Sequence, residues 1–171
     1  MDRPVRKPIR LKNYDYSAPG AYIITICTRE KRCILSEIVK PDGRDVGEGL
    51  APPVVRLSAV GRVAEEQVLS LSSRFPGLSI DDYVIMPNHI HLLVSLHRDP
   101  GGASPSPTAG TNVVNAVRTL KSLPARLSGT GPLWQRSYYD HIIRNEDDYR
   151  QIAEYIEANP ARWVEDRFYL P

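Results

Sequence analysis

Tyr83 to Val94 reads YVIMPNHIHLLV, and this stretch decides how the rest of the chain is interpreted. Apolar residues lie on both sides of Pro87-Asn88, a residue pair that favours turns. The pattern therefore predicts two strands joined by a tight turn, one over residues 79–86 and one over residues 89–96.

Two histidines alternate with one apolar residue at the start of the second predicted strand. Residues i and i+2 of a strand point to the same face, so His89 and His91 lie side by side, about 6 to 7 Å apart along the chain. Buried imidazoles need partners for their ring nitrogens. A shared metal ion with hydrogen-bonded outer partners meets that need, and hydrogen bonds within a core are the alternative.

The remaining elements follow from hydrophobic periodicity and from capping residues. Strands are predicted over residues 21–28, 33–38, 54–57 and 138–143. Helices are predicted over residues 59–74 with Ser58 as N-cap, 112–123 with Pro124 ending or kinking it, and 147–158 with Asn145 or Asp147 as N-cap. This order predicts an α+β fold with an antiparallel sheet and helices on one side.

The last predicted helix contains YIEAN, in which Tyr155 and Asn159 are one turn apart on the same face. That face lies beside the apolar stripe, so core packing does not fully explain Tyr155. Asn159 either contributes an amide oxygen to a site or ends the helix before Pro160.

Together these residues fit a phosphoryl-transfer mechanism. Two neutral imidazoles and one amide oxygen leave positions open on a hard divalent ion, Mg²⁺ or Mn²⁺, which accepts phosphate oxygens. Tyr155 could then attack in line and conserve the bond energy as a phosphotyrosine. A phenol with a pKa near 10 needs a proton acceptor, and no motif in the sequence identifies it.

The bulk composition is that of one soluble globular domain over residues 1–171, of which 42% are hydrophobic and 25% are charged. No apolar run approaches the ~20 residues needed to cross a bilayer, and no signal peptide is visible, so a cytoplasmic protein is expected. The linker-like composition of residues 98–112 predicts a flexible loop.

Net charge is only +2, but basic residues crowd an N-terminal arm over residues 1–16. Arg6, Lys7 and Arg10 of this arm are candidates to neutralise DNA phosphates. A solvated terminus is the alternative interpretation.

The motifs resemble a known family. HIH within MPNHIHLL is similar to the HUH motif (histidine, hydrophobic residue, histidine) of single-tyrosine transposases. LWQRSYYDHIIRN at 133–145, YIEANP at 155–160 and the opening NYDYSAPGAYIITICT resemble the REP-associated tyrosine transposases over nearly the whole chain.

The resemblance implies a ferredoxin-like (RRM-like) sheet with the HUH pair on a central strand. The implied partner is single-stranded DNA beside a hairpin, often a repetitive extragenic palindrome (REP), and the implied cofactor is Mg²⁺ or Mn²⁺. His89, His91 and Asn159 match the metal ligands, and Tyr155 matches the nucleophile that forms a 5′-phosphotyrosine link. Asn159 replaces a glutamine of related insertion-sequence enzymes.

Further residues are candidate DNA contacts. Trp134, Arg136 and Arg144 could stack on bases or bind phosphates, although Trp134 could equally pack in the core. Lys121 could contact DNA or lie on a solvated helix face. Three other tyrosines compete for the nucleophile role: Tyr138, Tyr139 and Tyr149.

Two other functions fit the same sequence. One is a domesticated DNA-binding regulator of repeat elements with little or no cleavage activity. The other is a phosphoesterase that releases its product to water. Either a monomer or a homodimer is compatible with the motifs, and a short link between the last strand and the Tyr155 helix favours an active site within one chain.

Overall fold

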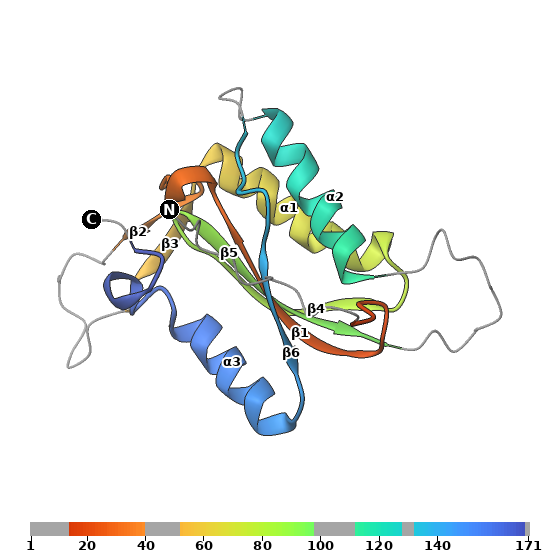
Figure 1. The fold of residues 1–171 in the computed structure, drawn as a ribbon. Coiled ribbons are helices and arrows are strands. Elements are labelled where there is room, and N and C mark those ends of the chain that lie inside the picture. The colour runs from red at the N-terminus through yellow and green to blue at the C-terminus, as the bar shows by residue number, and fades with distance from the viewer. Residues whose placement is uncertain (1–13, 40–51, 98–111, 128–131, 170–171) are drawn as a thin grey trace, which may run out of the picture.

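A four-stranded antiparallel sheet lies at the centre of the computed structural model (Figure 1), which describes residues 14–39, 52–97, 112–127 and 132–169. Its strands, in spatial order, are β4 (Leu78–Ile85), β5 (His89–Leu96), β1 (Gly20–Cys27) and β6 (Tyr139–Ile143). In chain order, helix α1 (Ala59–Arg74) comes before β4, and α2 (Val113–Leu127) lies between β5 and β6. This β-α-β-β-α-β arrangement is ferredoxin-like. The predicted α+β class and the interior position of the histidine strand are confirmed.

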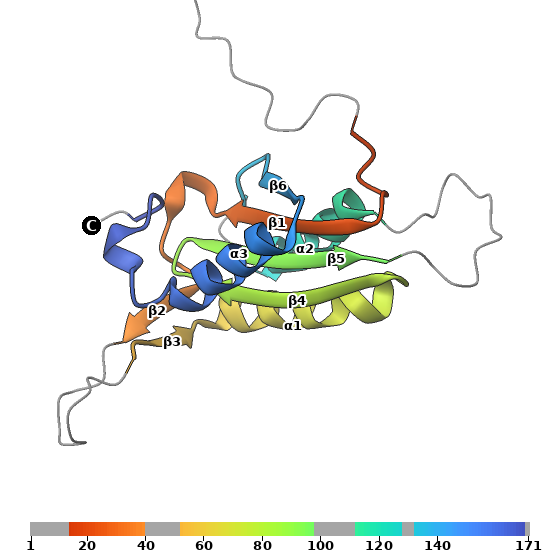
Figure 2. The ribbon, with the colours of Figure 1, turned by 90° about the horizontal axis from the view of Figure 1, so that it is seen from below.

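The sheet is covered on both faces. Helices α1 and α2 pack together on one face, and α3 (Glu146–Ala158) crosses the other (Figures 1 and 2). α3 is thus the exception to the expectation that the helices share one side. The physical reason lies in β5, which is buried on both faces of its pleat and therefore needs cover on both.

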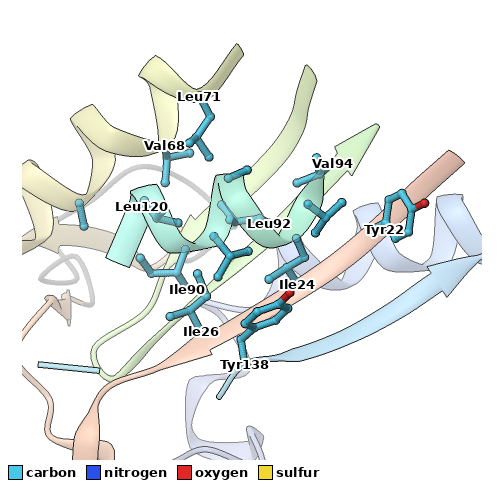
Figure 3. Packing of buried hydrophobic residues seen from close by; sticks show 14 of the residues in the cluster. Tyr22, Ile24, Ile26, Val68, Leu71, Ile90, Leu92, Val94, Leu120 and Tyr138 are labelled. Atoms are coloured by element: carbon cyan, nitrogen blue, oxygen red, sulfur yellow. The ribbon is translucent and has the colours of Figure 1, made fainter. Parts of the chain in front are cut away.

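The larger hydrophobic core lies between the sheet and the α1–α2 pair. Alternate residues of β5 and β1, among them Ile90, Leu92 and Ile24, point towards Val68 and Leu120 of the two helices (Figure 3). A smaller core around Met86, Leu93 and Ile156 lies under α3. The two faces of β5 therefore have different uses: one holds the main core, and the other carries both histidines.

The remaining elements agree closely with the predicted boundaries. Strands β2 (Ser36–Val39) and β3 (Val54–Leu57) pair as a separate antiparallel ribbon. Ser58 caps α1 by accepting a hydrogen bond from the Gly61 amide at 3.0 Å, and Asn145 caps α3 in the same way through Asp148. Two boundaries were wrong: β2 begins at Ser36 rather than at residue 33, and α2 continues through Pro124 to Leu127. The predicted flexible loop lies almost wholly outside the described residues.

Gly61 lies where α1 passes the chain before β2. A Cβ atom at this position would be 2.0 Å from the Leu35 carbonyl oxygen. In an ordinary helix, alanine is more stable than glycine by ~1 kcal/mol. Here the added Cβ atom would clash with the backbone of Leu35, which cannot easily move aside. We expect Gly61→Ala to lower the free energy of unfolding by about 1–3 kcal/mol in urea titrations. Leu69→Ala on the exposed side of α1 is the control, with a change of at most about 0.5 kcal/mol. A stabilised Gly61→Ala protein would contradict this packing.

Candidate active site

The site is built on the α3 face of the sheet, across three neighbouring strands. Strand register places Thr25 of β1 opposite His91 of β5 on one side and Tyr139 of β6 on the other. Side chains that are paired across antiparallel strands share a face. His91, Thr25 and Tyr139 therefore form one row across the sheet, and α3 lies over its histidine end.

Both histidines are buried and turn the same ring nitrogen towards each other. The Nε2 atoms of His89 and His91 are 3.0 Å apart. The Nδ1 atom of His91 lies 2.8 Å from Thr25 Oγ1, and that of His89 lies 2.9 Å from Asn88 Oδ1. An Nδ1–H donated to Asn88 Oδ1 leaves the Nε2 lone pair of His89 free, which is the tautomer that a metal requires.

Burial lowers the pKa of both imidazoles well below the ordinary value. In His89 the second cause is the neighbouring His91 ring, and in His91 the Arg167 charge adds to burial while Asp166 opposes it. The sign follows directly, since a lowered histidine pKa means a neutral ring at pH 7. Neutral imidazoles are the form that binds divalent ions.

Tyr155 extends from α3 to this pair within the same chain. Its hydroxyl lies 3.3 Å from His91 Nε2 and donates a hydrogen bond to Asp166 Oδ2 at 3.0 Å. The residue is 39% exposed, so a substrate can reach it. Partial burial and then the Asp166 carboxylate raise the pKa of the phenol. The hydroxyl is therefore protonated at neutral pH, with an acceptor already in contact.

Asn159 ends α3 and is buried beside the same carboxylate. Its Nδ2 donates to Asp166 Oδ2 at 3.1 Å, and its Oδ1 is buried without a hydrogen-bond partner among the described residues. Ligand atoms of His89, His91 and Asp166 all lie within 4.8 Å of one another. The site thus offers two imidazole nitrogens, a carboxylate oxygen of Asp166 and the amide oxygen of Asn159 as possible metal ligands. The amide oxygen of Asn159 has no hydrogen-bond partner among the described residues.

Open space adjoins the hydroxyl of Tyr155. A cleft of about 500 Å³ lies between the β6 edge of the sheet and α3, with walls that include Thr25, His91, Tyr139, Tyr155 and Arg167. A second hollow of about 290 Å³ is lined by Tyr155, Asn159 and Asp166. Tyr155 therefore lines two openings.

The competing tyrosines lie elsewhere or have other contacts. Tyr138 is buried in the larger core, and the hydroxyl of Tyr149 donates to Asp81 Oδ2 at 3.1 Å. Tyr139 is exposed at the edge of the cleft. Of these candidates, Tyr155 is the one whose hydroxyl contacts a histidine of the pair.

The candidate DNA contacts are more dispersed. Trp134 is buried in the larger core, so the packing interpretation is the one that the structure supports. Lys121 donates to the backbone carbonyls of Gln135 and Arg136 and so fixes the segment before β6. Arg136 and Arg144 are exposed. The arm residues Arg6, Lys7 and Arg10 lie outside the described residues.

Sequence reasoning missed four residues of the site. Thr25 lies within the opening motif, and Asp166 and Arg167 follow YIEANP, but nothing in their local sequence marks them as residues of the site. Asn88 had a signal, because it directly precedes the histidine pair. Its Nδ2 donates to the carbonyls of Lys31 and Phe168, which ties the β4–β5 turn to two distant segments.

Fold and site together define a ferredoxin-like protein with paired histidines and a helix tyrosine on one face of the sheet. The family model described as "Transposase IS200 like" matches residues 62–159, more than half of the chain. The chain belongs to this transposase family.

Three comparisons give more detail. An uncharacterized protein of Haemophilus influenzae is 33% identical over 180 residues, which cover 96% of this chain and 93% of that protein. A REP-associated tyrosine transposase of Escherichia coli is 29% identical over 87 residues. These residues cover 50% of this chain and 47% of that transposase. The solved structure of a REP-associated tyrosine transposase bound to a REP hairpin superposes with a TM-score of 0.58 at 19% identity, covering 90% of this chain and 74% of that one. The resemblance found in the motifs is confirmed, and the fold is shared.

Within the described part of the chain, no helix has the length and apolar character that crossing a membrane requires.

Proposed function

We propose that the chain is a metal-dependent transesterase that cuts and rejoins single-stranded DNA beside a REP-type hairpin. The observation that carries this proposal is the contact of the Tyr155 hydroxyl with His91 Nε2 at 3.3 Å, beside the facing nitrogen of His89. The names of its relatives, transposases of REP elements, supply the substrate class. The Tyr155 hydroxyl contacts His91 of its own chain, which supports an active site assembled within one chain.

The residues present fit a divalent ion, Mg²⁺ or Mn²⁺. His89 and His91 would hold it through Nε2, and Asn159 would contribute its Oδ1, which is otherwise a buried acceptor without a donor. An unsatisfied buried polar atom costs roughly 1–3 kcal/mol, so a ligand role explains why it is kept. When bound, the ion would polarise the scissile phosphate and offset charge in the transition state.

Asp166 supplies the proton acceptor that the sequence could not identify. Tyr155 Oη forms a bond to phosphorus as the bond from phosphorus to the 3′ oxygen breaks. The phenolic proton passes to Asp166 Oδ2, which already accepts it as a hydrogen bond, and the leaving 3′ oxygen takes up a proton from solvent to become a hydroxyl. The product is a 5′-phosphotyrosine, and attack by a 3′-hydroxyl reverses the step to rejoin DNA.

DNA outside the active site is held by charge. Arg136 and Arg144 are exposed on the segments that flank β6, and Arg6, Lys7 and Arg10 are proposed to neutralise further phosphates from the N-terminal arm. These contacts are independent of base sequence.

The proposal is tested with a hairpin oligonucleotide carrying a single-stranded flank, from the REP-type palindromes of the genome that encodes the chain. It is labelled at the 5′ or at the 3′ end and incubated with protein and Mn²⁺. The 3′-labelled fragment is expected to run as a protein adduct in a denaturing gel, and the 5′-labelled fragment to run free. Release of both fragments without an adduct would indicate hydrolysis. Hairpin binding without cleavage under Mg²⁺ or Mn²⁺ would indicate a DNA-binding regulator.

The substitution Asp166→Asn tests whether this carboxylate accepts the proton of Tyr155 or binds the metal ion. The amide keeps the shape of the side chain but is a far weaker base, so we expect adduct formation to slow about 10²-fold or more. Mn²⁺ affinity in calorimetry should stay within a few-fold of wild type, since Asn159 rather than Asp166 is the proposed ligand. A large loss of Mn²⁺ affinity would instead make the carboxylate a ligand, and an unchanged rate would remove its role as acceptor.

A further inference from the structure

Tyr139 is an exposed aromatic residue at the edge of the cleft. It is 43% exposed and stands on β6, an edge strand of the sheet. Register places it in the same row as Thr25 and His91. Strand β1 lies between β6 and the histidine strand, so two strand spacings of about 4.8 Å separate the backbones at Tyr139 and His91. Tyr155 and Tyr139 line the same cleft.

A cation and a second ring stand beside Tyr139. The Arg167 guanidinium lies 5.7 Å from the centre of the Tyr139 ring and 4.5 Å from that of Phe168. Arg167 is exposed and forms no ion pair among the described residues. Its charge is therefore available to a phosphate, while its guanidinium lies near both rings.

The other exposed large apolar side chains do not share this setting. Val54, Leu69 and Val164 are more exposed than Tyr139 but line neither of the two hollows around Tyr155. Isolated exposed apolar residues of that kind are ordinary. Tyr139 differs because it lines the same cleft of about 500 Å³ as Tyr155 and Arg167, and this cation forms no ion pair among the described residues.

We propose that Tyr139 and Arg167 form a subsite for one nucleotide adjacent to the scissile phosphate. The base stacks on the exposed face of Tyr139, and Arg167 binds the phosphate of the same nucleotide. This inference rests on the proposed function and adds to it a binding site for the DNA strand. Every base has an aromatic face, so the subsite recognises the presence of a base rather than its identity.

The test uses the hairpin substrate with an abasic site placed, one position at a time, along the nucleotides that flank the cleavage point. For wild type, one abasic position is expected to slow adduct formation by roughly 10- to 100-fold, in line with the loss of one base–aromatic stack. Exchange of the base at that position should change the rate only a few-fold. Tyr139→Ala should slow cleavage of the intact substrate by a similar factor and should be insensitive to the abasic site. Tyr139→Phe keeps the ring and should behave as wild type.

The outcomes separate this inference from the function on which it rests. If wild type forms no adduct, the proposed function fails. If wild type forms the adduct but Tyr139→Ala cuts at the wild-type rate, only the subsite fails. The subsite also fails if the effects of Tyr139→Ala and of the abasic site simply multiply, because independent sites behave additively in free energy. Thermal unfolding of both variants, with Tyr139→Phe as the matched control, shows whether a slow variant is still folded.

Discussion

Replacing Tyr155 with phenylalanine is expected to abolish the covalent adduct, with a loss of at least about four orders of magnitude in rate. The variant keeps the ring that packs against His91, at 5.2 Å between ring centres, and removes only the hydroxyl. The hydroxyl that contacts His91 is thereby lost, and with it the proposed nucleophile. The adduct is measured on denaturing gels, and hairpin affinity, measured by mobility shift, should remain within a few-fold of wild type.

Tyr149→Phe is the matched control for this experiment. Tyr149 lies on the same helix as Tyr155, and its hydroxyl contacts Asp81 rather than the histidines. Removing that hydroxyl should leave the rate of adduct formation within a few-fold of wild type. If Tyr155→Phe formed the adduct as fast as wild type, another residue would have to be the nucleophile, and peptide mapping of the adduct would identify it.

The second large effect is expected from His91→Ala. This change removes one nitrogen of the facing pair and a group 3.3 Å from the Tyr155 hydroxyl, so both metal binding and the rate should fall. We expect about a 10³-fold slower adduct formation and no measurable Mn²⁺ binding at concentrations that saturate wild type. Chelation of divalent ions should stop wild type in the same way, and added Mn²⁺ should restore it.

His97→Ala provides the comparison. His97 is exposed outside the site, and its Nε2 contacts Ser79 Oγ at 3.2 Å. Its loss should change neither Mn²⁺ affinity nor rate. Cleavage by wild type in excess chelator would contradict a metal role for the histidine pair, whatever the behaviour of the variants. Unfolding curves for His91→Ala are needed alongside, because His91 is almost fully buried.

Much of the fold could be predicted because its signals are local. Helix α1 begins and ends at the predicted residues, since Ser58 is a capping side chain and the apolar residues that follow recur at helical spacing. Alternation over β5 placed His89 and His91 on one face. The face that α3 covers is a matter of tertiary packing, and its own amphipathic stripe does not specify which side of the sheet it will meet.

The candidate site was predictable only where its residues are close in sequence. The spacing of Tyr155 and Asn159 follows from the helix, and that of the histidines follows from the strand. Asp166 accepts hydrogen bonds from both Tyr155 and Asn159, yet it lies in a turn beyond α3 with no motif around it. Thr25 reaches His91 across 66 residues of chain. Long-range partners of this kind are fixed by sheet register, which one strand cannot reveal.

Trp134 is a residue that the sequence did identify, but with two possible roles. A tryptophan in a basic, aromatic segment is equally suited to stacking on DNA bases and to packing in a core. Its burial in the larger core shows that it has the packing role. Lys121 is similar, because its use as a donor to the backbone before β6 depends on a partner 14 residues away. Residue type alone did not distinguish these uses.

The distance along the chain between the two halves of the site also orders its assembly in time. Tyr155 follows His91 by 64 residues, which a ribosome adds in roughly 3 to 13 s at about 5–20 residues per second. Strand β6, the proposed nucleophile Tyr155 and then the proposed proton acceptor Asp166 emerge in that order. On the proposed function, a chain interrupted between His91 and Tyr155 would hold both histidines and lack the proposed nucleophile, so it would form no adduct with DNA.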